Sequence, residues 1–188
     1  MLKDIILKNR SYRRFYQDEK IELETLKELV DLARLSACSA NKQALKFVLS
    51  NTKEKNEIIF STLSWAGYLK DWEGPTDGEK PAAYIVIVGD RDISNHYSCD
   101  HGIVAQSILL GAVEKGYGGC MLGAISKDDL KKSLNLDDKF DILLVLALGK
   151  PKETVVIEKV IDDDIRYWRD ENNVHHVPKR DLNDLIIQ

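Results

Sequence analysis

Three arginines, Arg10, Arg13 and Arg14, stand within five positions near the start of the chain. On a helix, this spacing of three and four residues would place them on one side, next to the hydroxyl of Ser11. Guanidinium groups with a hydroxyl and free backbone N–H groups suit a phosphate monoester, because each contact is charge-assisted. The same arginines would equally complement the negative end of a preceding helix. The cluster alone is therefore consistent with an anion site and with a helix end.

Two carboxamides, Asn41 and Gln43, stand in the stretch "SANKQALKF" at 39–47. If this stretch is extended, the two side chains point the same way and offer both donors and acceptors. Such a pair suits a planar heterocycle with alternating carbonyl and N–H groups, for example the pyrimidine edge of a flavin. The alternative is a polar loop whose side chains satisfy backbone groups.

Three aromatic residues, Trp65, Tyr68 and Trp72, are spaced by three and four positions on an expected helix over 53–69 and its continuation. Aromatic residues at this spacing usually face a core. The loop that begins here could instead form one wall of a pocket for a flat substrate.

Three glycines, Gly116, Gly118 and Gly119, stand between an expected helix and an expected strand. A dinucleotide-binding fingerprint would follow a strand and open a helix, so the order here is the reverse. Gly116 is then predicted to end the helix, and the other glycines to let the backbone approach something closely packed.

The sequence favours no metal site and no catalytic side chain. His175 and His176 are adjacent, and His96 and His101 are not at a standard ligand spacing. No nucleophile elbow GxSxG occurs. The odd number of cysteines without CxxC spacing argues against disulfides and predicts buried free thiols at Cys38, Cys99 and Cys120.

The charge and length of the chain exclude several classes of protein. Twenty-seven Lys and Arg against 31 Asp and Glu give a net charge of -4 over 188 residues, which offers no general attraction to nucleic acid or to an anionic membrane. The apolar runs are shorter than the roughly 20 residues that cross a bilayer, and the N-terminus lacks a secretory signal. We expect a soluble cytoplasmic protein with one domain, 1–188.

Apolar periodicity predicts an α+β fold with helices wrapped round a sheet. Helices are expected around Leu2, Ile5 and Ile6 and over 22–35, 53–69, 97–116 and 126–134, with Ser126 as the N-cap of the last. Strands are expected over 46–51, 82–90, 119–125 and 141–149. After Pro151, charged residues alternate with isolated apolar ones, and a tail of this length over 151–188 needs a surface, which a second subunit could provide.

Five stretches, in this order, resemble the nitroreductase family of FMN-dependent oxidoreductases. "NRSYRRF" is similar to the family's basic phosphate-binding motif, and "SANKQALKF" to its Ser-x-Asn-x-Gln-Pro-Trp motif. The others are "GYGGCMLGAI" after the buried helix, "LALGKPKE" at the end of the last core strand, and "PKRDL" near the C-terminus. No motif is specific by itself, but five in order make coincidence improbable.

The resemblance implies a mostly antiparallel sheet wrapped by helices, and an obligate homodimer with an FMN at each subunit interface. The tail over 151–188 would embrace the partner. The phosphate would be bound by Arg10, Ser11, Arg13, Arg180 and Lys179. Asn41 and Gln43 would contact the isoalloxazine and ribityl region, and Met121, Leu122 and Gly123 would run past the ring.

The implied reaction carries hydride from NADH or NADPH through flavin N5 to a small conjugated acceptor, such as a nitroaromatic compound or a quinone, by a ping-pong mechanism. Trp65, Tyr68 and Trp72 would line the substrate pocket. The cofactor carries the chemistry, so no side-chain acid or base is expected. Two alternatives are a non-catalytic flavin- or phosphate-ligand-binding protein of the same fold, and an interaction protein whose arginines only flank a helix.

The chain departs from the family pattern at three places. Asn9 stands where many members have a first arginine, Ala44-Leu45 replaces Pro-Trp, and Met121 replaces a frequent Trp. The stretches 68–80 and 166–180 lie where members vary, so the acceptor and the choice of NADH or NADPH do not follow from the resemblance.

Overall fold

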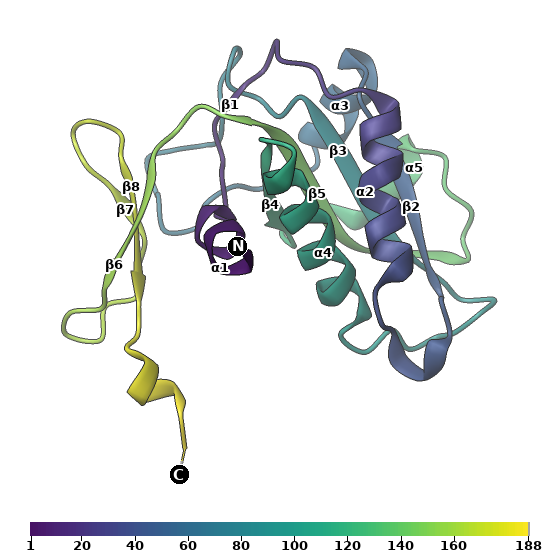
Figure 1. Ribbon diagram of the computed structural model, residues 1–188. Coiled ribbons are helices and arrows are strands. Elements are labelled where there is room, and N and C mark those ends of the chain that lie inside the picture. Colours follow the sequence, from purple (N-terminus) through teal and green to yellow (C-terminus); the bar gives the residue numbers. More distant parts are fainter. Residues whose placement is uncertain (188) are drawn as a thin grey trace.

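An antiparallel sheet forms the centre of the structure, a computed structural model that describes residues 1–187 (Figure 1). The strand β5 (Phe140–Pro151) pairs with β1 (Phe15–Tyr16), β3 (Ala83–Asp90) and β4 (Gly118–Leu122), and β2 (Leu45–Ser50) pairs with β3. Each of these pairings is antiparallel, which confirms the predicted sheet.

Both faces of the sheet are buried because its central strands are apolar on both sides. Along β3, Ile85 and Ile87 contribute to one hydrophobic cluster, whereas Tyr84 and Val86 contribute to the other. Successive side chains of a strand point to opposite faces, so a continuous apolar run covers both. The run of β-branched residues over 82–90 is accordingly a central strand, as predicted.

Two layers of helices cover the sheet (Figure 1). Helices α2 (Leu23–Leu35) and α4 (Asp100–Glu114) pack on one face, and α3 (Lys53–Phe60) and α5 (Lys127–Ser133) contribute to the cluster on the other. Helix α1 (Leu2–Lys8) packs against α4, and two short 3-10 helices are η1 (Ser39–Asn41) and η2 (Leu182–Leu185). Gly116 has φ of 82° just after α4, which confirms its predicted role at the helix end.

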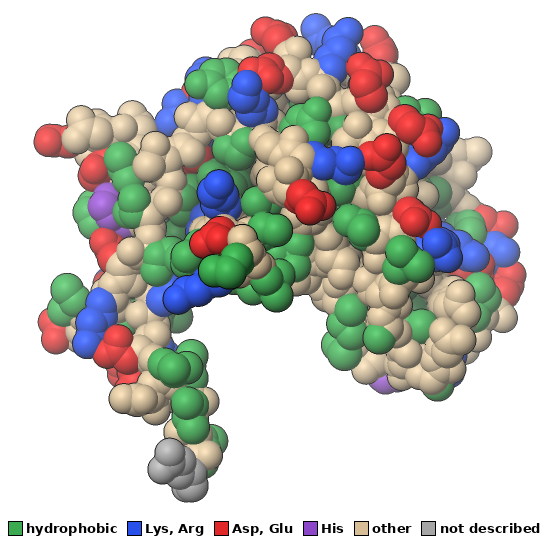
Figure 2. Space-filling view, in the orientation of Figure 1, with side chains coloured by type: hydrophobic (Ala, Val, Ile, Leu, Met, Phe, Trp, Pro, Cys, Tyr) green, Lys and Arg blue, Asp and Glu red, His purple; other side chains and the backbone are tan. Residues whose placement is uncertain are grey.

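The chain after Pro151 forms a small sheet of its own. In this sheet, β6 (Val155–Lys159) lies parallel to β8 (His175–Lys179), and β7 (Trp168–Arg169) is antiparallel to β8. Beyond β8, the chain stands away from the body across an open hollow (Figure 2). The tail is therefore partly supported by its own chain, and only its last residues have no surface to lie on within the described part.

The helix expected over 53–69 is wrong in its second half, because α3 ends at Phe60. Beyond it, Leu63 forms an antiparallel bridge with Ile125, and the Ser64 backbone N–H donates to the Ala124 carbonyl at 3.0 Å. Pairing with a distant segment replaces the helix there. Trp65, Tyr68 and Trp72 consequently do not share a helical face.

The expected burial of the three thiols is correct only for Cys120. Cys38 is half-buried and Cys99 is exposed, and all three are free. Burial raises the pKa of the Cys120 thiol. No helix among the described residues has both the length and the apolar character needed to span a membrane.

Candidate functional site

The N-terminal arginines lie in a loop (residues 9–14, hereafter the N-terminal loop) between α1 and β1, and not on a helix as their spacing suggested. Ser11 forms a parallel bridge with Gly119, and the Tyr12 N–H donates to the Gly119 carbonyl at 3.0 Å. The loop therefore runs beside β4, which contains the glycine-rich stretch.

The three arginines point to three different partners. Arg10 donates from Nη2 to the Ile6 carbonyl in the last turn of α1 at 2.9 Å, as a residue at a helix end does. Arg14 donates from Nε and Nη2 to the two oxygens of Glu79, at 2.6 and 2.5 Å, and this pair holds the pKa of the Glu79 carboxyl below its usual range. Arg14 is thus engaged in a structural ion pair.

Arg13 points toward the C-terminal tail and is only 9% exposed. Its Nη1 donates to the Ser11 carbonyl at 3.2 Å and lies 3.1 Å from Nε2 of His175. The guanidinium lies over the ring of Tyr167, 4.6 Å from the centroid. Because arginine can only donate, His175 must accept at Nε2 and carry its proton on Nδ1.

His175 is held in its neutral form. Burial, together with the positive charges of Arg13 and Arg169, lowers its pKa to about 4. The unfolded chain, in which histidine has a pKa near ~6.5, therefore takes up the proton first as the pH falls. The stabilisation that comes from keeping His175 neutral is fully present above about pH 6.5 and is lost progressively between about pH 6.5 and pH 4.

Acidification from pH 7 to pH 5.5 is expected to lower the free energy of unfolding of the wild type by about 1.4 kcal/mol more than that of His175→Gln. This follows from a slope of about 1.4 kcal/mol per pH unit for one proton. Glutamine retains an acceptor for Arg13 but does not titrate. Urea unfolding of both proteins at the two pH values measures the difference. Parallel losses in the two proteins would show that His175 is not the titrating group.

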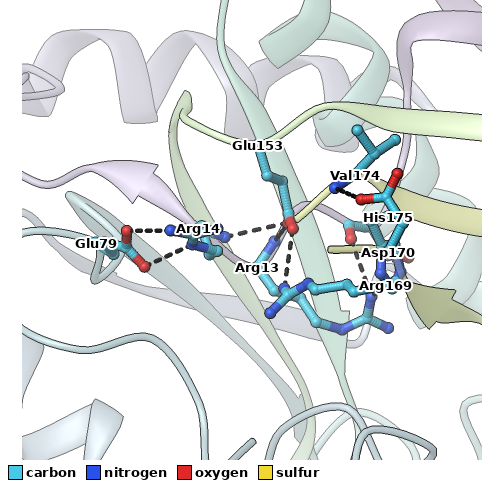
Figure 3. Close-up of polar contacts among 9 residues, drawn as sticks. Arg13, Arg14, Glu79, Glu153, Arg169, Asp170, Val174 and His175 are labelled. Atoms are coloured by element: carbon cyan, nitrogen blue, oxygen red, sulfur yellow. Dashed lines mark hydrogen bonds and ion pairs between the residues drawn. The ribbon is translucent and has the colours of Figure 1, made fainter. Parts of the chain in front are cut away.

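Glu153, which follows β5, connects the N-terminal loop to the tail (Figure 3). Its buried carboxylate accepts from the backbone N–H groups of Arg13 and Arg14 and, at 2.9 Å, from Nη2 of Arg169. Arg169 also lies over the ring of Trp72, 4.2 Å from its centroid. The Glu153 carboxylate thus joins the N-terminal loop to Arg169 of the tail, and Arg169 in turn contacts Trp72.

The cluster has more positive than negative charge. Two carboxylates, Glu79 and Glu153, accompany four cations, namely Arg13, Arg14, Lys152 and Arg169. Among the ion pairs of the described residues, none involves the guanidinium of Arg13 or of Arg10, and the buried Nε atoms of both lack a partner. Buried cations without counter-charges are unfavourable, so the arrangement suits an added anion.

Asn41 and Gln43 lie in a turn and not in the extended segment on which their common direction depended. Their φ values are both 52°, and the Ser39 N–H is held by the Asp100 carboxylate at 2.9 Å. Both side chains are exposed, and Gln43 lines a cavity of about 240 Å³ at the start of β2. Figure 1 places η1 on the side of the molecule opposite the tail.

The predicted ring-contacting residues lie at the end of β4. Leu122 is buried, Met121 is half-buried, and Gly123 is exposed with open space where a Cβ would stand. Because Ser11 pairs with Gly119 of the same strand in parallel, β4 and the N-terminal loop run in the same direction from this bridge. The structure therefore places this group on the strand that flanks the loop.

Lys179 and Arg180 lie at the far end of β8 from Arg13. A strand rises about 3.3 Å per residue, so Lys179 stands roughly 13 Å beyond His175 along the strand. Arg180 pairs with Asp163, and both Lys179 and Arg180 are exposed. Within one chain, the structure does not bring these two residues to Arg13.

The three predicted pocket aromatics lie in different environments. Trp65 is buried in the core, 8% exposed and packed against Phe60. Tyr68 is exposed and packs on Tyr167, with ring centroids 4.9 Å apart, and Trp72 lies under Arg169. Only Tyr68 and Trp72 therefore border the cluster around Arg13.

Five residues of the cluster were not identified from the sequence, namely Glu79, Lys152, Glu153, Tyr167 and Arg169. Glu153 belongs to the stretch "LALGKPKE", so its position beside a motif was visible although its partners were not. His175 was considered only as a metal ligand, whereas the structure gives it a partner in Arg13.

Comparison with known proteins gives similarities over most of the chain. A family model described as the nitroreductase family matches residues 6–150. A Cr(VI) reductase of a Pseudomonas species is 26% identical over 175 residues, covering 80% of this chain and 67% of that protein. A Bacillus subtilis protein named as an NAD(P)H nitroreductase is 20% identical, covering 79% of this chain and 87% of the relative. The solved structure of an FMN-dependent nitroreductase from Clostridium difficile has a TM-score of 0.65 at 21% identity, covering 85% and 91% of the two chains.

Proposed function

Because the chain belongs to the nitroreductase family, we propose that it is an FMN-dependent oxidoreductase that uses NADH or NADPH to reduce a small conjugated acceptor in a ping-pong reaction. The names of its relatives support the oxidoreductase class and, for one solved structure, dependence on FMN. When bound, FMN supplies the hydride-transfer chemistry. The acceptor class, a nitroaromatic compound, a quinone or a similar electrophile, is part of the proposal.

Arg13 is the observation that carries the proposal. It is a buried cation without a carboxylate partner, its Nε is free, and it lies beside Ser11 in a cluster with surplus positive charge. A phosphate monoester would supply both the missing charge and the missing acceptor. We therefore propose that Arg10, Ser11 and Arg13 hold the FMN phosphate, since the unpartnered Nε of Arg10 also lies in this loop.

The remaining proposed contacts require two copies of the chain. Met121, Leu122 and Gly123 flank the N-terminal loop within one chain, whereas Asn41 and Gln43 lie on the opposite side of the molecule from the tail (Figure 1). A homodimer would bring the turn of one copy to the loop of the other. We propose that Lys179 and Arg180 likewise reach a phosphate only in the assembled dimer.

Apolar surface supports the homodimer. The tail beyond β8 exposes Leu182, Leu185 and Ile186, and it stands clear of the body (Figure 2). A cavity of about 280 Å³ between α1, α2 and α4 is lined by Leu2, Ile5, Leu32, Ser107, Leu110, Gly111 and Glu114. Exposed apolar surface of this kind is characteristic of protein interfaces. We propose that the tail of each copy packs on the other copy.

The side chains of this chain bind and orient and do not transfer protons. The cationic cluster would fix the phosphate end of the cofactor, and the backbone at the end of β4 would lie along the ring. Tyr68 and Trp72, which border the cluster, would limit access of water and select flat acceptors. Trp65 would support this wall from the core.

A visible spectrum of the purified protein, before and after anaerobic addition of NADH or NADPH, tests the proposal. We expect a flavin absorption band that bleaches on reduction and returns when a quinone is added. The rate with each nucleotide would establish which reductant is preferred.

Two results would contradict the proposal. Bound FMN that neither nucleotide reduces would indicate a non-catalytic flavin-binding protein. A colourless protein that stays colourless after FMN is added and the excess is removed would indicate that the arginines have a structural role.

A further inference from the structure

Glu153 carries a buried charge whose hydrogen bonds go to the backbone of the N-terminal loop. Its side chain is 0% exposed, and its Oε1 accepts from the consecutive N–H groups of Arg13 and Arg14 (Figure 3). Its Oε2 accepts from Arg169. A buried carboxylate is tolerated when it is paired and its acceptors are used, and Glu153 meets both conditions.

The N-terminal loop has few other restraints. It lies between α1 and β1, and its backbone is linked to distant parts of the chain by two bonds: the Tyr12 N–H donates to the Gly119 carbonyl at 3.0 Å, and the Lys152 N–H donates to the Arg14 carbonyl at 2.9 Å. The next two N–H groups along the chain, those of Arg13 and Arg14, both go to Glu153. Glu153 therefore holds both N–H groups in the half of the loop from which the Arg13 side chain departs, whereas Lys152 holds only the carbonyl at its end.

Glu79 is a second glutamate of the same cluster, with the same charge as Glu153 but with different partners. Its carboxylate binds the side chains of Arg14 and, at 3.3 Å, of Lys152, and it makes no bond to the backbone of the loop. Glu79 can neutralise charge without setting the path of the loop. The two glutamates thus separate an effect of charge from an effect of position.

We propose that Glu153 is a positioning residue that holds the N-terminal loop in the conformation that binds the phosphate of FMN. The inference rests on the proposed function. If Glu153 acted only through its negative charge, removing the carboxylate would have the opposite effect on phosphate affinity to the one expected if it positions the loop. Without Glu153, the cluster is more positive and would attract a phosphate more strongly, whereas a loop without its anchor must be ordered on binding and would hold the phosphate more weakly.

The test compares the affinities of flavin-free wild type, Glu153→Ala, Glu153→Gln and Glu79→Ala for FMN and for riboflavin, which lacks the phosphate. We expect Glu153→Ala to raise the Kd for FMN about tenfold and to leave the Kd for riboflavin within about twofold. Glu79→Ala should leave the FMN Kd unchanged or lower it. Glu153→Gln should fall between, because its carbonyl can still accept from the loop while its amide faces Arg169.

The ratio of the two Kd values separates positioning from general damage. A Glu153→Ala protein that loses affinity for FMN and riboflavin by the same factor, or that binds FMN as the wild type does, overturns the inference. If Glu153→Ala does not fold, Glu153→Gln provides the same ratio. A wild type with no preference for FMN over riboflavin instead overturns the proposed phosphate site, and the inference with it.

Discussion

Replacing Arg13 with alanine is expected to weaken FMN binding by about 10- to 100-fold, because a hydrogen bond to a charged group contributes about 1.5 to 3 kcal/mol. The substitution removes the buried guanidinium whose Nε has no partner within the chain. It also removes the only arginine of the N-terminal loop that points toward the tail. Titration of flavin-free protein with FMN, followed by fluorescence, measures the loss.

Arg14→Ala is the matched control. Arg14 stands next to Arg13 and carries the same charge, but both of its side-chain hydrogen bonds go to Glu79. We expect its FMN Kd to change less than about threefold, while the free energy of unfolding falls by about 1 kcal/mol through loss of the partly buried pair. Equal weakening by the two substitutions would contradict the assignment of Arg13 to the phosphate.

The spacing of the arginines predicted a common face, and the structure gives each a separate partner instead. Glu79 follows Arg14 by 65 positions, and His175 follows Arg13 by 162. Local spacing determines which side chains can meet only when the segment is helical. Here the segment is a loop, so long-range partners decide the directions, and a single sequence does not identify them.

The central strands were predictable because their signal is local and strong. The apolar run over 82–90 covers both faces of the sheet, and no neighbour changes that requirement. The stretch after Phe60 has a comparable helical pattern, but pairing of Leu63 with Ile125 overrides it. Tertiary pairing of this kind has no marker in the local pattern.

The common direction expected for Asn41 and Gln43 in an extended segment is wrong for a different reason. Ala40, Asn41 and Gln43 all have positive φ, a conformation that Asn adopts readily and that Ala and Gln adopt rarely. Residue type therefore argued for an extended chain at two of the three positions. The family resemblance identified Asn41 and Gln43 as a pair without requiring their backbone conformation.

In the glycine-rich stretch, the missing side chain of Gly119 allows close packing against other parts of the protein. A Cβ at Gly119 would lie 2.6 Å from the Ala147 carbonyl oxygen and 2.6 Å from Leu109 Cδ2. The Ala147 oxygen belongs to β5, which is paired on both sides and is not free to move. The small residue at position 119 is thus required by the packing of β4 between β5 and α4.

We expect Gly119→Ala to lower the free energy of unfolding by about 3 kcal/mol, since overpacking against a fixed backbone costs about 1 to 3 kcal/mol and more where relaxation is blocked. Gly123→Ala is the control, because nothing lies within 4 Å of its Cβ position. That substitution should be neutral or stabilise by a few tenths of a kcal/mol through reduced freedom of the unfolded chain. Urea unfolding followed by circular dichroism measures both. If the two variants unfold at the same urea concentration, β4 is not held as closely to β5 as the distances indicate, and the N-terminal loop that pairs with Gly119 has room to shift.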